Sequence, residues 1–131
     1  MNLLITGSRA ATFEEDYEKL KAAIVKYAPE VTEILHGGAR GVDTLAGRYA
    51  EENGIPVTVI RPDYGKYPAR VAPLMRNTEL VKLCDECIAY YKGAQKGGTL
   101  DTATKARKAG KLLVEIIDGK EQEPPKQLGL F

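Results

Sequence analysis

The distribution of apolar residues along the chain predicts alternating strands and helices. Short, largely apolar runs are typical of strands that are buried inside a parallel sheet. Such runs lie at 3–6, 31–35, 57–60, 87–91 and 112–117. Between them, apolar residues recur three and four positions apart, as they do in amphipathic helices. These helical segments lie at about 13–27, 42–53, 73–83 and 99–109.

This strict alternation predicts βαβ units with right-handed crossovers. We therefore expect an α/β fold, a Rossmann-like doubly wound parallel five-stranded sheet in the order 3-2-1-4-5, with helices on both faces. Local signals support the helix boundaries. Thr12 with Glu15 matches a capping box, Asn53-Gly54 is a helix stop, and Pro73 suits a first helical turn.

Four polar or glycine-rich turns follow the first four strands, and in a parallel sheet the corresponding strand ends lie at one edge. The turns are TGSR at 6–9, HGGARGVD at 36–43, RPDYG at 61–65 and KGAQKGGT at 92–99. In doubly wound sheets the ligand crevice lies at that edge, here between strands 1 and 4. Glycine turns that lead into helices expose backbone N–H groups to anions. The alternative is that each glycine only makes a tight turn.

Composition and charge limit the classes of function. With 44% hydrophobic residues in a chain of 131, one globular domain has a sufficient core. A net charge of +1 argues against a surface devoted wholly to nucleic acid. No apolar run reaches membrane-spanning length and no signal peptide is evident, so we expect a cytoplasmic protein. We expect a ligand-binding domain at 1–117 and a flexible, Pro-containing tail at 118–131.

Several residues offer chemistry, each with a structural alternative. Arg9 and Arg40 suit a phosphate. Asp43, in a first helical turn, either complements the helix dipole or accepts hydrogen bonds from ribose hydroxyls. His36, the single histidine, would suit a general base, although a structural role is the more common one. No GxGxxG fingerprint, Walker motif or four-ligand zinc pattern is present, and the CDEC pair reads as two reduced cysteines, so we expect no cofactor and no metal.

The ordered set ITGSR, HGGARGVDTLA, RPDYGKY, PLMRN and GGTLDTA resembles the SLOG superfamily in its YspA/YpsA-related branch, over residues 2–117. It is also similar to the DNA-processing protein A (Smf) family, which binds single-stranded DNA, and to the Lonely-Guy family, which hydrolyses nucleoside 5′-monophosphates. The resemblance implies a Rossmann-like fold, often dimeric, over a nucleotide-like ligand. Carried over by position, the ligand-binding residues are Gly7, Ser8, Arg9, Gly37, Gly38, Arg40, Gly41, Asp43, Arg76, Asn77, Gly98 and Thr99.

The Lonely-Guy hydrolase pattern GGxGTxxE is only partly matched. Aligned on Gly98-Thr99, it places Thr102 at the glutamate position, and Gln95 and Lys96 at the first two glycines. We therefore assign no catalytic residue and leave open whether the protein is an enzyme. Asp101, next to Thr102 in the sequence, is the alternative carboxylate.

The last residues resemble the bacterial sliding-clamp-binding motif. In QLGLF the anchors would be Gln127, Leu128, Leu130 and Phe131, with Gly129 replacing the more usual serine or aspartate. The alternative is that this segment packs on its own sheet or on a dimer mate. We thus expect a nucleotide-derivative or nucleic-acid-ligand-binding protein of a bacterium or phage, recruited to the clamp. The alternatives are a Lonely-Guy-like phosphoribohydrolase and a DNA-processing-like accessory that binds single-stranded DNA.

Overall fold

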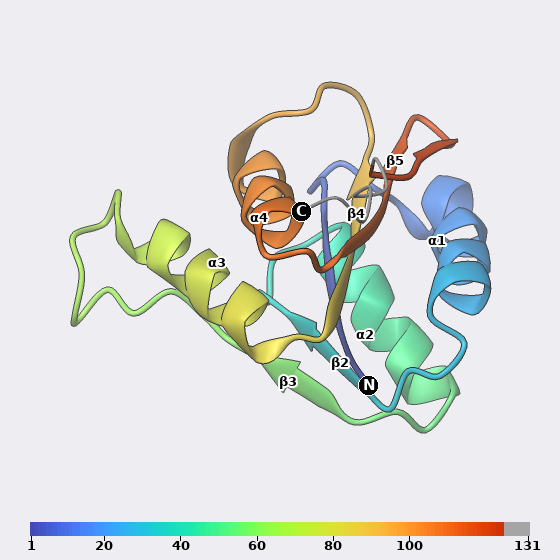
Figure 1. The fold of residues 1–131 in the computed structure, drawn as a ribbon, viewed down its shortest axis with the longest axis horizontal. Coiled ribbons are helices and arrows are strands. Elements are labelled where there is room, and N and C mark those ends of the chain that lie inside the picture. The colour runs from blue at the N-terminus through green and yellow to red at the C-terminus, as the bar shows by residue number, and fades with distance from the viewer. Residues whose placement is uncertain (125–131) are drawn as a thin grey trace, which may run out of the picture.

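A twisted sheet of six strands forms the centre of the molecule in a computed structural model, which describes residues 1–124 (Figure 1). The strands are β1 (Asn2–Gly7), β2 (Glu33–His36), β3 (Val57–Val59), β4 (Glu86–Tyr91), β5 (Leu112–Ile117) and β6 (Lys120–Gln122). Their order is β3-β2-β1-β4-β5-β6, and the first five strands pair in parallel. The predicted fold class and the order 3-2-1-4-5 are confirmed.

Two helices cover each face of this sheet (Figure 1). The helices are α1 (Phe13–Tyr27), α2 (Val42–Glu52), α3 (Ala72–Leu83) and α4 (Gly97–Lys108). Successive side chains of β1 alternate between the faces, since Leu3 and Ile5 pack with α1 and α2 whereas Leu4 packs with α3 and α4. All three side chains are fully buried, which explains why the centre of the strand is apolar.

The start of α1 differs in one detail from the predicted capping box. The Thr12 hydroxyl accepts from the Glu15 N–H at 3.2 Å, as expected. The return bond, however, runs from the Thr12 N–H to the carboxylate of Asp16 at 2.8 Å rather than to Glu15. The carboxylate one position further along is buried beneath the turn, whereas Glu15 is exposed. The helix stop at Gly54 (φ 65°) and the position of Pro73 in the first turn of α3 are as predicted.

The segment assigned to the tail contributes a sixth strand. β6 pairs antiparallel with β5 through a turn in which Asp118 (φ 49°) and Gly119 (φ 81°) both have positive φ. An Asp-Gly pair with this geometry makes the tight hairpin that best suits strand twist. Lys26 and Tyr27 of α1 both donate to Glu121 and hold the hairpin. The predicted anchors Gln127, Leu128, Leu130 and Phe131 lie outside the described residues.

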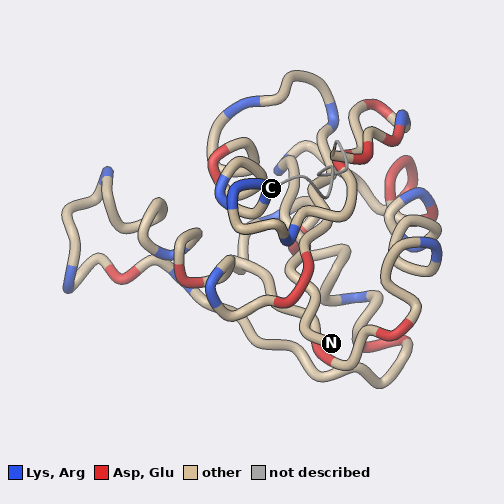
Figure 2. Tube along the Cα trace, in the orientation of Figure 1, with Lys and Arg blue, Asp and Glu red and all other residues tan. Residues whose placement is uncertain are grey.

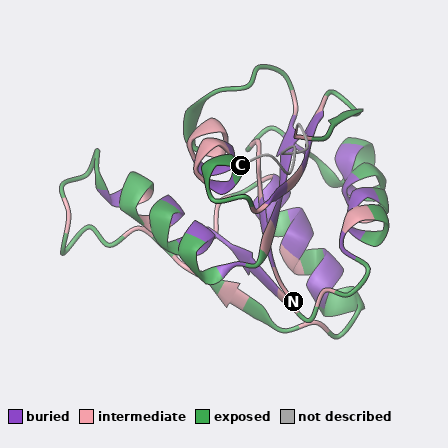
Figure 3. Ribbon diagram, in the orientation of Figure 1, coloured by how far each residue is buried: buried purple, intermediate pink, exposed green. Residues whose placement is uncertain are grey.

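The other edge of the sheet is less covered than the sequence predicted. Val57 and Val59 of β3 are 39% and 41% exposed, because the edge strand lies beyond the helices that cover β1 and β2. The loop 60–71 and the start of α3 extend away from the body and are largely exposed (Figure 3). Within residues 1–124, no helix combines the length and apolar character needed to cross a membrane.

Candidate functional site

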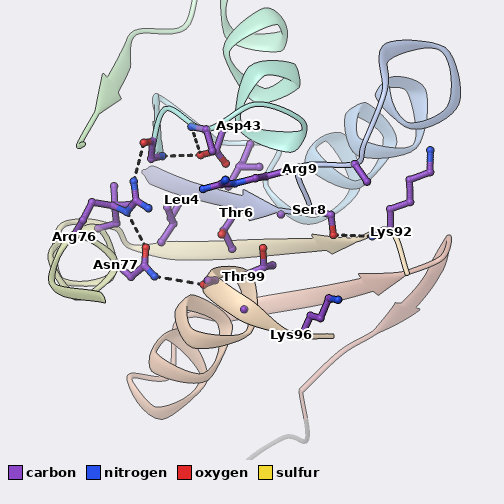
Figure 4. A pocket seen from close by; sticks show the side chains of 18 of the residues that line it. Leu4, Thr6, Ser8, Arg9, Asp43, Arg76, Asn77, Lys92, Lys96 and Thr99 are labelled. Carbon is purple, nitrogen blue, oxygen red and sulfur yellow. Dashed lines mark hydrogen bonds between the residues drawn. The ribbon is translucent and has the colours of Figure 1, made fainter. Parts of the chain in front are cut away.

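A cavity of about 550 Å³ lies at the carboxyl ends of β1 and β4 (Figure 4). These two strands flank the point at which the strand order reverses, where doubly wound folds bind ligands. The cavity is lined by Leu4, Ile5, Thr6, Gly7, Ser8, Arg9, Ala10, Gly37, Ala39, Asp43, Arg76, Asn77, Leu80, Lys92, Ala94, Lys96, Gly97, Gly98 and Thr99. Nine of the twelve residues predicted from the sequence are in this set, and Gly38, Arg40 and Gly41 are not.

The turn after β1 forms one part of the wall. At Gly7 a Cβ would lie 2.5 Å from both the Tyr90 carbonyl oxygen and Val42 Cγ2, so only glycine fits between β4 and α2. The Ser8 N–H donates to the Tyr90 carbonyl at 3.0 Å, and the Ser8 hydroxyl oxygen accepts from the Lys92 N–H at 2.9 Å. Within residues 1–124 the hydroxyl of Ser8 donates no hydrogen bond, so its hydrogen is available to a ligand.

Arg9 extends across this turn towards the α3 side of the cavity (Figure 4). Within residues 1–124 its guanidinium has no hydrogen-bonding or ionic partner, and the residue is exposed. A guanidinium with all its donors uncommitted can bind a phosphate or carboxylate with two parallel hydrogen bonds.

The turn after β2 is shaped by Asp43. One carboxylate oxygen of Asp43, Oδ2, accepts from the N–H groups of Gly37 and Ala39, each at 3.1 Å. The side chain is only 6% exposed. Burial raises the pKa of Asp43 above its usual 3.8, although the two N–H bonds and the neighbouring charges of His36 and Arg76 act in the opposite direction. Asp43 therefore braces the glycine turn from inside, while it also lines the cavity.

The three predicted residues outside the cavity occupy the rest of this turn. Gly41 allows the first two turns to touch, because a Cβ there would lie 2.3 Å from the Ser8 carbonyl oxygen. The Gly38 carbonyl accepts from Arg61 at 3.2 Å. Arg40 is exposed. The glycines thus shape the site from behind, and the structure does not bring Arg40 to the cavity.

Two residues of α3 close the next part of the wall and link three elements. Arg76 Nη1 donates to the Gly37 carbonyl and Nε to the Asn77 side-chain oxygen, both at 2.8 Å. Asn77 in turn donates to Asp101 of α4 at 3.1 Å. Burial, and more weakly the charge of Arg9, lower the pKa of the Arg76 guanidinium, while Asp43 raises it. The cavity wall therefore contains two guanidinium groups close enough to repel each other.

The start of α4 supplies the opposite wall. Lys96 caps the helix by position only, since its side chain makes no capping hydrogen bond, and Gly97 has a φ of 67°. Lys96, Gly97, Gly98 and Thr99 all line the cavity, so the unpaired N–H groups of the first turn are next to it.

Lys92 and Lys96 are not among the residues predicted from the sequence, although both lie in the KGAQKGGT turn that follows the fourth strand. Lys96 is exposed at the cavity, whereas Lys92 Nζ pairs with Glu15 at 3.0 Å and Asp16 at 3.2 Å. The hydrogen bonds that Lys92 donates to these carboxylates raise its pKa. A lysine in a glycine-rich turn next to a helix start was the available signal.

The candidates for acid-base chemistry lie outside this cavity. The Thr102 hydroxyl, at the position of the hydrolase glutamate, donates to the Gly98 carbonyl at 2.9 Å. Asp101 is occupied by Asn77 and by an ion pair with Lys105 at 2.8 Å. His36 Nδ1 accepts from the Gly38 N–H at 3.0 Å, and burial lowers the pKa of His36. None of the three lines the cavity, and His36 Nδ1 is bonded within the glycine turn.

The two cysteines have no place in this site either. Cys84 and Cys87 are free and buried in the core beneath α3 and α4, and burial raises the pKa of both thiols. Thiols with raised pKa values are poor nucleophiles at neutral pH. The pair therefore contributes to packing rather than to chemistry.

The sheet order, with a cavity at its reversal point, defines a Rossmann-like domain. Residues 1–67 match the family described as YspA, cpYpsA-related SLOG family. The chain is also 33% identical over 122 residues to the Gene 61 protein of Mycobacterium phage D29, an alignment that covers 88% of this chain and 96% of that protein. The chain therefore belongs to the YspA, cpYpsA-related SLOG family, as the motifs predicted.

Proposed function

We propose that the cavity binds a phosphate-bearing nucleotide derivative. The observation that carries this proposal is the convergence of uncommitted donors on one cavity at the switch point. They are the Arg9 guanidinium, the Ser8 hydroxyl and the uncapped first turn of α4. Membership of the SLOG family supports a nucleotide-derivative or nucleic-acid ligand.

The electrostatics of the cavity favour an anion. Arg9 and Arg76 are close enough for the charge of Arg9 to lower the pKa of Arg76. A phosphate between the two guanidinium groups would relieve this repulsion and accept hydrogen bonds from both. Lys96 and the positive end of the α4 dipole add further attraction from the opposite wall. In this proposal the nine cavity residues contact the ligand, and Gly38 and Gly41 shape the turn behind it.

Isothermal titration of the full chain with AMP tests this proposal. Arg9→Ala should lower the affinity about 10- to 100-fold, because it removes a charge-assisted contact. Arg70→Ala, an exposed arginine of the loop 60–71 outside the cavity, is the matched control and should bind AMP normally. Mass spectrometry of small molecules that co-purify with wild type, and are lost from Arg9→Ala, gives the natural ligand. Equal binding of AMP by wild type and Arg9→Ala would contradict the proposal.

The structure disfavours Lonely-Guy-like hydrolysis. The hydroxyl of Thr102 is turned onto its own helix, and the carboxylate of Asp101 is held by Asn77 and Lys105. No carboxylate from α4 lines the cavity. We therefore expect no free base when the protein is incubated with nucleoside 5′-monophosphates, and release of base would restore the hydrolase reading.

The distribution of charge likewise disfavours a DNA-processing-like grip on single-stranded DNA. Figure 2 shows lysine and arginine interspersed with aspartate and glutamate along the described helices rather than gathered into a continuous track. A backbone-tracking groove needs such a basic track. Binding to single strands that weakens steeply with added salt would reverse this conclusion.

We further propose that the QLGLF segment recruits the protein to a bacterial sliding clamp in the cytoplasm. Support comes from the sequence, which offers Gln127, Leu128, Leu130 and Phe131 as anchors. Similarity to a phage protein is consistent with such a setting. A Leu130→Ala, Phe131→Ala double variant should lose binding to purified clamp in surface plasmon resonance, whereas Lys126→Ala should retain it. Unchanged binding by the double variant would refute this recruitment.

We also propose a homodimer. Support comes from apolar side chains at the β3 edge and along α3, where Val57, Val59 and Leu74 are each 39–44% exposed. Exposed apolar surface of this kind is typical of association sites. Sedimentation equilibrium should give twice the chain mass, and Val59→Glu should shift it towards the monomer. Glu18→Gln, on the exposed side of α1, should leave the mass unchanged.

A further inference from the structure

Asp43 presents a second carboxylate oxygen to the cavity. Its Oδ2 is committed to the N–H groups of Gly37 and Ala39, each at 3.1 Å. Its Oδ1 has no hydrogen-bonding partner within residues 1–124, although the residue is more than nine-tenths buried and lines the cavity. An acceptor oxygen that lines a cavity and has no partner among these residues can accept a hydrogen bond from a ligand.

The chemistry of that group follows from the carboxylate. An ionised carboxylate only accepts hydrogen bonds, so the ligand atom facing Asp43 must carry an O–H or N–H. A phosphate oxygen is excluded there by charge repulsion. Arg9, Lys96 and the α4 first turn, by contrast, only donate. The α2 wall of the cavity therefore offers a hydrogen-bond acceptor, whereas the other walls offer hydrogen-bond donors.

The acceptor and the donors lie on different sides of the same cavity. Figure 4 shows Asp43 above the ends of the strands, with Thr99 and Lys96 below them and Arg9 between. A matching ligand has an anionic group at one end and hydroxyl donors at the other. The residues bonded to the Asp43 carboxylate, Gly37 and Ala39, are small, and among residues 1–124 no aromatic side chain lines the cavity to stack a base. This surrounding suits a sugar better than a nucleobase.

We propose that Asp43 accepts a hydrogen bond from ribose hydroxyls, so that the cavity selects ribonucleoside phosphates with a free sugar over their deoxy analogues. This inference rests on the proposed nucleotide function and specifies its ligand class. It separates the ligand from the interior of a DNA strand, which lacks the 2′-hydroxyl and carries a phosphodiester at the 3′-oxygen.

The first test compares AMP, 2′-deoxy-AMP and 2′,3′-dideoxy-AMP on the wild-type chain by isothermal titration. The three differ only in the hydroxyls that Asp43 would bind. We expect the affinity for AMP to exceed that for the dideoxy compound about 10-fold or more, because the analogue cannot donate to the Asp43 carboxylate inside the cavity.

The second test uses Asp43→Asn. The asparagine oxygen can still accept from the Gly37 and Ala39 N–H groups, while its NH₂ replaces the free oxygen, so the turn is retained and the acceptor is lost. AMP binding should fall about 10-fold, whereas binding of the dideoxy compound should change less than about 2-fold. Asp63→Asn, in the exposed loop outside the cavity, is the matched control and should retain the full preference for AMP. Thermal melting checks that each variant is folded.

The outcomes are distinguishable. Equal affinity of wild type for AMP and the dideoxy compound overturns the role of Asp43 but leaves nucleotide binding standing. Absence of binding for all three compounds overturns the proposed function and this inference together. If Asp43→Asn fails to fold, the wild-type comparison of the three compounds still decides the matter.

Discussion

Arg76 Nη1 donates to the carbonyl oxygen of Gly37 over 2.8 Å, and this bond joins α3 to the glycine turn after β2. The same guanidinium donates through Nε to Asn77 at 2.8 Å. Arg76 therefore holds the wall of the cavity together from the inside, and its positive charge faces the place where we locate the anion.

Arg76→Lys should both destabilise the fold and weaken ligand binding. A lysine ammonium cannot reproduce two divergent bonds of a planar fork, so at least one polar partner is left unpaired. We expect a loss of about 1–3 kcal/mol in the free energy of unfolding, measured by urea denaturation. Arg70→Lys, on the exposed loop, serves as the control and should change it by less than about 0.5 kcal/mol. If Arg76→Lys were equally neutral, the bonds of Arg76 would not stabilise the fold.

Gly41 and Gly47 should respond to alanine in opposite directions. Gly41 has φ 78° and ψ −127°, a conformation that costs other residues about 1–3 kcal/mol. An added Cβ would also lie 2.3 Å from the Ser8 carbonyl oxygen. Gly41→Ala should therefore abolish folding or lower the melting temperature sharply.

Gly47 lies within α2, and the nearest contact of an added Cβ is His36 Nε2 at 3.5 Å, an ordinary distance. Gly47→Ala should raise the free energy of unfolding by about 0.5–1 kcal/mol, because alanine loses less conformational entropy in a helix. Differential scanning calorimetry should show a lower melting temperature for Gly41→Ala and a higher one for Gly47→Ala. A stabilised Gly41→Ala would mean that the two turns do not touch as described.

The sequence was sufficient to predict five of the six strands and nine of the nineteen residues that line the cavity. Continuous apolar runs separated by helical periodicity leave few topologies, and the strand order places the turns after β1 and β4 side by side. Gly7 and Gly37 were recognisable because they follow strands directly. The family motifs added Arg76 and Asn77, whose helix position alone gave no reason to select them.

The remaining features of the site and of the sheet depend on tertiary contacts that no local sequence pattern encodes. Lys92 and Lys96 belong to a polar turn without periodicity, and whether each faces the cavity or a carboxylate is decided by α1. Arg40 was predicted for the cavity, but the turn directs it to solvent. One oxygen of Asp43 bonds the glycine turn and the other does not, and this can be known only from the backbone conformation of residues 37–39. The Asp118-Gly119 pair is a hairpin signal, but the polar residues that follow it favour a flexible tail over a strand.

The buried carboxylate of Asp16 should make stability depend on pH in the acid range. Burial alone would raise the pKa of Asp16, but hydrogen bonds from Thr12, Tyr90 and Lys92 outweigh it and hold the pKa below its usual 3.8. Since the unfolded chain then binds the proton more readily, this contribution is complete above about pH 4 and is lost as the pH falls through the folded pKa.

We therefore expect Asp16→Asn to reduce the free energy of unfolding by about 1–3 kcal/mol at pH 7, and by progressively less below pH 4. Glu18→Gln, exposed on the same helix, should show a constant and small difference. Urea denaturation at a series of pH values from 7 to 3 provides the measurement. A difference for Asp16→Asn that does not vary with pH would disprove this linkage.

His36 should remain neutral in the folded protein at pH values where a free histidine is half protonated. Its Nδ1 accepts from the Gly38 N–H at 3.0 Å, so protonation there would break the bond that begins the glycine turn. Burial and the charge of Arg61 lower the pKa of His36 below 6.5, against the opposing effect of Asp43. The unfolded chain thus binds a proton that the folded chain excludes, and stability should fall as the pH drops below about 6.5.

Because the chain has one histidine, its Cε1 proton gives a single titrating NMR signal, which we expect to show an apparent pKa below 6.5. His36→Asn keeps an acceptor for Gly38 without a titrating group and should remove the change in stability between pH 7 and 5. A wild-type signal that titrates at or above 6.5 would contradict the role of His36 as a neutral acceptor.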